Sequence, residues 1–187
     1  MSKADMYSYM SEDKKANVGD CGIIKMIAKY IFGTSDGVMA YHYLRSLRKY
    51  EYAINSNTGS FVDRLRLAWY KFKNNLLSKK YNLVIYPNTV GPGLRIPHVI
   101  GGGMIINCES MGCNCVVNTG VIIGLKNDLE TRPVIGNNVN ICIGAKIIGK
   151  VEIGNNSLIG PNSVVVRDVK ENEIVAGIPA KVIKVKS

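Results

Sequence analysis

Histidine is scarce in this sequence: His42 and His98 are the two among 187 residues. A metal site built from several imidazoles is therefore disfavoured, and we expect no metal. There is no run of about 18 apolar residues, so we predict no membrane-spanning helix. The first fifteen residues lack the apolar core of a signal peptide.

The five cysteines are odd in number, and their spacing does not suggest a disulfide framework. We expect free, mostly buried thiols and a reducing, cytoplasmic location.

Acidic residues are outnumbered, and the formal net charge is +10. Most of the positive excess lies before residue 84, where there are 14 basic and 7 acidic residues. This balance favours anionic partners such as coenzyme phosphates or a membrane surface, although a simply solvated basic surface explains it equally well. No nucleic-acid-binding module is recognisable, so we expect no nucleic-acid partner.

An aliphatic residue recurs every six positions in the second half of the chain. The uninterrupted series comprises Ile135, Ile141, Ile147, Ile153, Ile159 and Val165. Shorter series with the same spacing are Ile105, Met111, Val117 and Ile123, and Val84, Val90 and Ile96. This period predicts a parallel β-helix whose coils have three short strands, with one inward aliphatic residue on each. Glycine and asparagine after these positions suit corners with positive φ.

The period is interrupted at two places. Ile96 and Ile105 are nine residues apart, and the extra residues lie in the segment PHVIGGG, which contains His98. An insertion that bulges from a regular coil is a sensible place for a site. Residues 125–133 are charged and contain a proline, so we predict an excursion from the coil there.

The first 82 residues have a helical period. We predict helices over residues 18–32, 38–55 and 60–80, with Ser35 or Asp36 as a cap of the second. The predicted organisation is a helical region at 1–82 and a β-helix domain with a C-terminal tail at 83–187.

The third predicted helix is amphipathic and basic. Its apolar face comprises Phe61, Leu65, Ala68, Trp69, Phe72 and Leu76. Such a helix can lie on a membrane surface, so peripheral membrane contact is one interpretation. We favour the other, in which this face packs on the neighbouring domain.

His98 is the candidate general base. It is followed by three glycines, which allow close approach of backbone to a ligand. A neutral imidazole can accept a proton from an alcohol near neutral pH. We interpret His42 as a structural or surface residue of a helix.

The repeats, the segment IPH at 96–98 and the ending AGIPAKVI at 176–183 resemble the hexapeptide-repeat acyltransferases. Serine acetyltransferases and capsular or exopolysaccharide O-acetyltransferases are the most similar branches. The resemblance implies a left-handed parallel β-helix, a homotrimer and direct acetyl transfer from acetyl-CoA, with His98 as the base.

The resemblance also implies roles for further residues. Acetyl-CoA contacts are expected at Ala145, Pro161, Val166, Arg167, Lys181 and Lys184, and a substrate contact at Asn118. Ala145 matches a residue whose backbone lines the pantetheine groove, and the two lysines match basic residues near the coenzyme phosphates. A turn or ladder role for Asn118 is the alternative.

Three departures from the serine acetyltransferases guide our choice of acceptor. Pro97 replaces an aspartate, Thr131 and Arg132 replace an Arg-His pair before Pro133, and Val84 replaces the carboxylate that orients the histidine. We therefore predict a sugar hydroxyl in polysaccharide biosynthesis as the acceptor. A backbone carbonyl is then expected to orient His98.

Two alternatives stay open. Serine O-acetylation keeps the chemistry and changes the acceptor, whereas a non-catalytic trimeric scaffold keeps only the fold. A zinc-dependent carbonic anhydrase with the same prism is excluded, because it needs three histidines and the repeat region has one.

Overall fold

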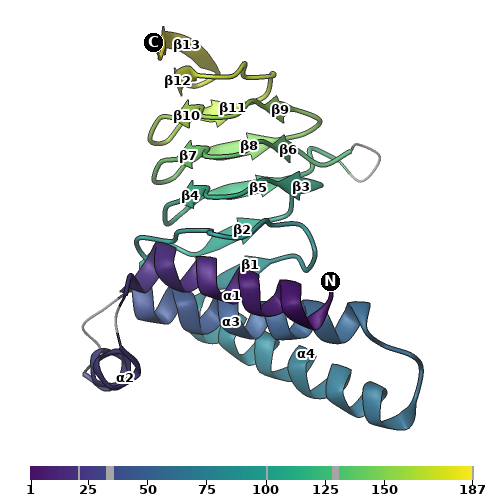
Figure 1. Cartoon of the computed structure of the whole chain (residues 1–187). Coiled ribbons are helices and arrows are strands. Elements are labelled where there is room, and N and C mark those ends of the chain that lie inside the picture. Colours follow the sequence, from purple (N-terminus) through teal and green to yellow (C-terminus); the bar gives the residue numbers. More distant parts are fainter. Residues whose placement is uncertain (21, 33–35, 100, 128–130, 187) are drawn as a thin grey trace.

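The computed structural model describes residues 1–20, 22–32, 36–99, 101–127 and 131–186. Helices gather at one end of the molecule, and short strands wind away from them in a tapering stack of coils (Figure 1). The C-terminus lies at the opposite end of that stack (Figure 1).

The described helices are α1 (Lys3–Val18), α2 (Ile23–Ile31), α3 (Asp36–Asn55) and α4 (Phe61–Tyr81). The prediction missed α1 and began the next helix too early, at residue 18 instead of Ile23. The inward face of α1 has little apolar periodicity, because it buries Met6 and Met10 together with Asp13. Ser2 and Asp5 cap its start reciprocally. Ser35, a predicted cap, lies outside the described residues.

The strands are β1 (Leu83–Ile85), β2 (Met104–Ile106), β3 (Ser110–Met111), β4 (Val116–Val117), β5 (Ile122–Gly124), β6 (Val134–Ile135), β7 (Asn140–Ile141), β8 (Lys146–Ile148), β9 (Glu152–Ile153), β10 (Leu158–Ile159), β11 (Val164–Val165), β12 (Glu173–Gly177) and β13 (Ala180–Val185). They form sheet A (β1-β2-β5-β8-β11), sheet B (β3-β6-β9) and sheet C (β4-β7-β10-β12-β13). All pairs are parallel except β12–β13. The fold is a left-handed parallel β-helix with an N-terminal helical region, as predicted.

Inward aliphatic residues stack between successive coils. On sheet A, for example, Ile106, Ile123, Ile147 and Val165 lie in register and are almost fully buried. The prediction was wrong at β1 and β2: Val84 and Ile105 point outward and are 41% and 42% exposed. Both strands consist entirely of apolar residues, so hydrophobicity alone does not tell which side faces the core.

Asparagines turn many of the corners. Left-handed backbone conformations occur at Asn88, Asn114, Asn138, Asn156, Asn162 and Asn172, which confirms the corner role that their sequence positions suggested. The corners that join sheet C to sheet A are called the His98 edge, and they comprise residues 97–99, 118–121, 142–145 and 160–163. The corners that join sheet A to sheet B are called the loop edge, and they comprise residues 124–127, 131–133, 149–151 and 166–168. Residues 125–127 and 131–133 of the predicted excursion carry no strand, and its middle, residues 128–130, lies outside the described residues.

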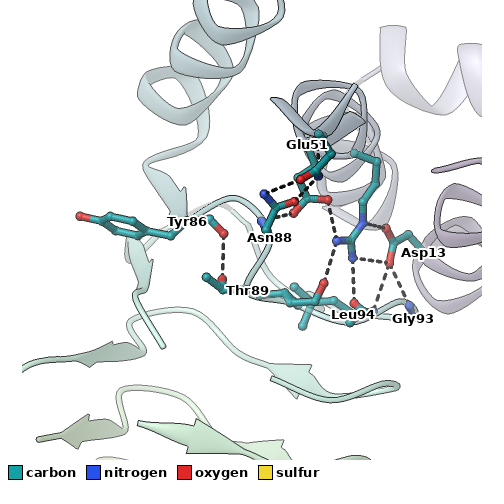
Figure 2. Close-up of polar contacts among 11 residues, drawn as sticks. Asp13, Glu51, Tyr86, Asn88, Thr89, Gly93 and Leu94 are labelled. Carbon is teal, nitrogen blue, oxygen red and sulfur yellow. Dashed lines mark hydrogen bonds and ion pairs between the residues drawn. The ribbon is translucent and has the colours of Figure 1, made fainter. Parts of the chain in front are cut away.

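A buried ionic cluster holds the helices on the first coil (Figure 2). Arg48 of α3 is fully buried and contacts Asp13 of α1 at 2.9 Å and Glu51 at 3.0 Å. Its remaining donors reach the carbonyls of Val90 and Gly91, both at 2.8 Å. The cluster therefore joins two helices to the coil by charge-assisted hydrogen bonds.

The carboxylates of this cluster accept hydrogen bonds from backbone amides of the first coil. Asp13 accepts hydrogen bonds from the Gly93 and Leu94 amides, and Glu51 accepts one from the Asn88 amide (Figure 2). Burial would by itself lower the pKa of Arg48, but the two carboxylates raise it above its ordinary value. The guanidinium is therefore charged in the folded protein.

Helix α4 packs through a different face from the one predicted. Its buried residues are Asn74, Leu77 and Tyr81, whereas Leu65, Trp69 and Phe72 are 56%, 61% and 56% exposed. Both faces carry apolar residues, so the pattern did not distinguish the packed face from the exposed one.

Other features of the described residues bear on the expectations. Cys108, Cys113, Cys115 and Cys142 are free thiols, and Cys21 lies outside the described residues. No helix within the described ranges is long and apolar enough to cross a bilayer.

Candidate active site

The imidazole of His98 is exposed at the first corner of the His98 edge. Its neighbours Ile96 and Val99 are buried and anchor the backbone on either side. The His98 side chain itself is 65% exposed, so it can meet a substrate from solvent.

A carboxylate from the helical region faces this imidazole. Asp36 is the first residue of α3, and its Oδ2 lies 3.3 Å from Nδ1 of His98. A proton on Nδ1 would be donated to Asp36, which leaves Nε2 as the acceptor that a general base needs. The expectation that a backbone carbonyl orients His98 was therefore wrong. Sequence reasoning missed Asp36 because the two residues are 62 positions apart.

Asn17, near the end of α1, contacts the segments on which Asp36 and His98 lie. Its side-chain amide donates to the Leu94 carbonyl at 2.7 Å, and its side-chain oxygen accepts from the Ile96 amide at 2.9 Å. Gly37, next to Asp36, packs so closely on Asn17 that an added Cβ would lie 2.1 Å from the Asn17 carbonyl oxygen. The end of α1 thus sets the position of Asp36 relative to the first coil.

Two of the three glycines after His98, Gly102 and Gly103, are required by close packing. A Cβ on Gly102 would lie 2.5 Å from Oγ1 of Thr119, and one on Gly103 would lie 2.6 Å from Nδ2 of Asn82. Gly103 also has a φ of +63°, which disfavours a side chain. The predicted bulge is therefore a tightly packed corner.

A groove runs from this corner along the outer face of sheet A. Its volume is about 650 Å³. Its floor includes the outward side chains Val84, Ile105, Ile122 and Val164, and it extends from Gly102 and Gly103 as far as Ile178. Asn82 and Gly103 also line a small crevice with His98, so the groove adjoins the imidazole. Lys146 lies between Ile122 and Val164 in this floor, and its ammonium group donates to the Gly120 and Gly144 carbonyls. The otherwise apolar floor, with backbone at its margin, fits an elongated chain such as a pantetheine arm.

Three other predicted residues lie on the His98 edge. The side-chain amide of Asn118 donates to the Ile141 carbonyl at 3.1 Å, so this donor is used within sheet C. Ala145 is fully buried, its amide bonds to the Cys142 carbonyl, and its carbonyl accepts from the Ile122 amide. Pro161 is exposed at a later corner.

The remaining predicted residues lie elsewhere. Val166 and Arg167 are exposed on the loop edge, on the other side of sheet A, and Val166 lines a hollow of about 620 Å³ with Lys126 and Lys150. Lys181 and Lys184 are exposed on β13 at the far end of the coil. A single chain therefore does not bring all the predicted coenzyme contacts together.

The three sequence departures have defined places. Pro97 is half-buried beside His98, and Val84 points outward into the groove. Arg132 lies on the loop edge with its guanidinium 5.8 Å from the Tyr86 ring centre. The described residues contain no group of three or more His, Cys, Asp or Glu side chains that could hold a metal ion.

Comparisons with known proteins agree with this geometry. The family model "Bacterial transferase hexapeptide (six repeats)" matches residues 132–167. A serine acetyltransferase of Synechococcus elongatus is 39% identical over 103 residues, which cover 53% of this chain and 41% of that protein. One from Buchnera aphidicola is 28% identical over 196 residues, which cover 98% of this chain and 72% of that protein.

Solved structures extend the likeness to the helices. The serine acetyltransferase of Neisseria gonorrhoeae superimposes with a TM-score of 0.71 and 24% identity, over 99% of this chain and 67% of that one. That of Brucella abortus in complex with coenzyme A gives 0.74 and 22%, over 99% and 70%. At these identities the likeness establishes the fold.

Residues 132–167 thus match the bacterial hexapeptide transferase repeat, and the whole chain shares the fold of the serine acetyltransferases. The chain spans about two fifths of the Synechococcus protein and about seven tenths of the Buchnera protein.

Proposed function

We propose that the protein is an acetyl-CoA-dependent O-acetyltransferase and that its acceptor is the hydroxyl group of serine. The observation that carries this proposal is the Asp36–His98 pair, in which a base and a carboxylate meet at an exposed corner beside a long groove. The relatives support the choice of acceptor, because serine acetyltransferases match both the repeats and the helix that contributes Asp36.

The proposed reaction needs one base and no covalent enzyme intermediate. Nε2 of His98 takes the proton of the acceptor hydroxyl as its oxygen attacks the thioester carbonyl. The tetrahedral intermediate then collapses, the C–S bond breaks, and the leaving thiolate receives the proton from His98. Asp36 keeps the imidazole oriented and stabilises the imidazolium that forms between these steps. Its charge also favours an acceptor with an ammonium group.

Acetyl-CoA is proposed to lie along the groove on sheet A, with its thioester near His98. The groove leads towards the end of the coil, where Lys181 and Lys184 supply charge for the coenzyme phosphates.

A homotrimer would complete this site. The His98 edge and the loop edge flank opposite sides of sheet A, and the outward residues of that sheet include Val84, Ile105 and Ile122. Packing of the His98 edge of one copy beside the loop edge of the next would turn the groove on this apolar face into a cleft between two copies. It would also bring Val166 and Arg167 of a neighbouring copy towards the groove.

A sugar hydroxyl is the second candidate acceptor. Pro97 puts an uncharged residue beside His98, and Arg132 is engaged with Tyr86 on the loop edge. Both observations weaken recognition of a free amino acid, which would then rest on Asp36.

Thiol release from acetyl-CoA tests the proposal. The purified protein is supplied with L-serine or with a panel of mono- and oligosaccharides, and His98→Ala and Asp36→Asn serve as variants. We expect serine-dependent release that falls about 10²- to 10⁴-fold in His98→Ala, the usual contribution of general-base catalysis. Asp36→Asn should lower kcat/KM for serine while leaving coenzyme binding intact.

Each outcome assigns the function differently. Release with sugars and not with serine would transfer the proposal to the second acceptor. Coenzyme binding without release in either set would refute serine as the acceptor. Failure to bind the coenzyme would indicate a scaffold without catalysis.

A further inference from the structure

An apolar stripe runs along the outside of α4. Phe61, Leu65, Trp69, Phe72 and Leu76 follow one another at intervals of three or four residues, which places them on one face. They are 50% to 75% exposed. Helix α4 buries the other side, through Asn74, Leu77 and Tyr81, so the stripe faces away from the protein.

Positive charge borders this stripe on both sides. Helix α4 contains Arg64, Arg66, Lys71, Lys73, Lys79 and Lys80 against the single acid Asp63. At 100° per residue, Arg64 and Lys71 flank one side of the stripe and Arg66 and Lys73 the other, whereas Lys79 lies in line with the stripe at its end. Arg66 is already paired with Asp63 at 2.8 Å. Arg64, Lys71 and Lys79 are exposed.

Helix α2, which packs on α3, lies at the same end of the molecule. Ile24, Ile27 and Ile31 lie on one face and are 86%, 50% and 69% exposed. Figure 1 shows α2 and α4 at the end of the molecule away from the C-terminus. This end therefore offers two helices with exposed apolar faces and a surplus of basic residues.

We propose that α4 binds to the surface of an anionic lipid membrane, with the stripe inserted between head groups and the exposed residues Arg64, Lys71 and Lys79 paired with lipid phosphates. Charge complementarity selects this occupant, because an apolar strip bordered by Lys and Arg is the pattern of a helix lying in a bilayer interface. The helix is far too charged to cross the bilayer. Trp69 sits in the middle of the stripe, and tryptophan favours this interface.

A second copy of the chain fits the same surface less well. A symmetric contact would place each basic flank against the same flank of the partner. Those like charges would repel one another over a screening length of about 10 Å at 0.1 M salt.

The single tryptophan of the chain makes the test direct, because Trp69 lies on the stripe itself. The full-length protein is mixed with vesicles of pure phosphatidylcholine, or with vesicles containing one third phosphatidylglycerol, at low and high salt. Binding is followed by co-flotation and by Trp69 emission. We expect binding to the anionic vesicles, a blue shift, and protection of Trp69 from a soluble quencher.

Two sets of variants separate the apolar and the charged contributions. Leu65→Glu with Phe72→Glu should weaken binding at least tenfold, because it places acids inside the stripe. The matched control is Tyr7→Glu on α1, where Tyr7 is 56% exposed, as are Leu65 and Phe72. This control should bind as the parent does.

The second set removes exposed positive charge beside the stripe and at its end. Arg64→Gln, Lys71→Gln and Lys79→Gln together should weaken binding roughly a hundredfold, from about a factor of five per basic residue. The same substitutions at Lys3, Lys14 and Lys15 on α1 remove equal charge elsewhere and should change binding only a few-fold. Circular dichroism and thermal melting check that each variant is folded.

Three results would overturn the proposal. One is a folded parent protein that ignores anionic vesicles at low salt. Another is binding that survives both glutamates of the stripe. The third is a parent protein that does not bind vesicles, together with a stripe variant whose oligomeric state differs from the parent's in sedimentation. That result would assign the stripe to a contact with a second copy. None of these results depends on acetyl transfer.

Discussion

Substitution of Gly37 by alanine should separate Asp36 from His98. The added Cβ would lie 2.1 Å from the carbonyl oxygen of Asn17, and ordinary contacts begin at 3.4 Å, so the first turn of α3 must move by about 1.3 Å. Asn17 cannot yield easily, because its side chain is bonded to Leu94 and Ile96 of the first coil. The present Asp36–His98 separation of 3.3 Å leaves no room for such a shift without loss of the contact.

The expected effect is much larger on catalysis than on stability. A misplacement of about 1 Å can lower turnover about 10²-fold, so kcat/KM in the thiol-release assay should fall by roughly that factor. Overpacking destabilises by about 1–3 kcal/mol, but alanine in place of a helical glycine stabilises by about 1 kcal/mol. The free energy of unfolding should therefore fall by about 2 kcal/mol at most.

A control and a double-mutant cycle make this reasoning refutable. Gly22→Ala is the control, since nothing lies within 4 Å of a Cβ there, and its activity should match the parent. If Gly37 acts through Asp36, Gly37→Ala should have little further effect in an Asp36→Asn background. Full activity of Gly37→Ala, or fully additive losses, would refute the assigned contact.

Two further predictions concern buried groups. Arg48→Met leaves Asp13 and Glu51 buried without their cation, so the free energy of unfolding should drop by about 3–5 kcal/mol; an unchanged melting temperature would contradict the role of the cluster. Burial raises the pKa of the Cys108 and Cys115 thiols from 9.0 to about 11. The thiols of the unfolded chain ionise first, so the free energy of unfolding should be constant below pH 9 and fall between pH 9 and 11. Urea titrations across this range measure the fall, which should be smaller in a variant with both cysteines changed to alanine.

Much of the β-helix was predictable because its six-residue period is a local property. Ile135, Ile141 and Ile147 each mark one side of a coil, and the structure keeps them in the core. The pattern failed at Val84 and Ile105, where neighbouring residues are equally apolar and register depends on the coil above. The same ambiguity hid which face of α4 is packed.

The candidate site was only half predictable, for a related reason. His98 was prominent because it interrupts the repeat, whereas Asp36 reaches it from another element through the packing of α1, α3 and the first coil. Helix α1 was itself missed, since its inward residue Asp13 is polar and becomes buried only because Arg48 pairs with it. Such long-range charge pairing leaves no periodic trace in a sequence.

The ionic cluster of Figure 2 also has a consequence for aggregation. A parallel β-helix ends in open backbone edges that can template further coils, and two such molecules could join end to end into a fibre. Here the open edge at the first coil is closed, because Asp13 and Glu51 accept its amides at Gly93 and Asn88 while Arg48 donates to its carbonyls. At the far end β13 turns back antiparallel on β12 and interrupts the parallel stack. The helical region therefore caps the first coil against end-to-end assembly, in addition to supporting the site.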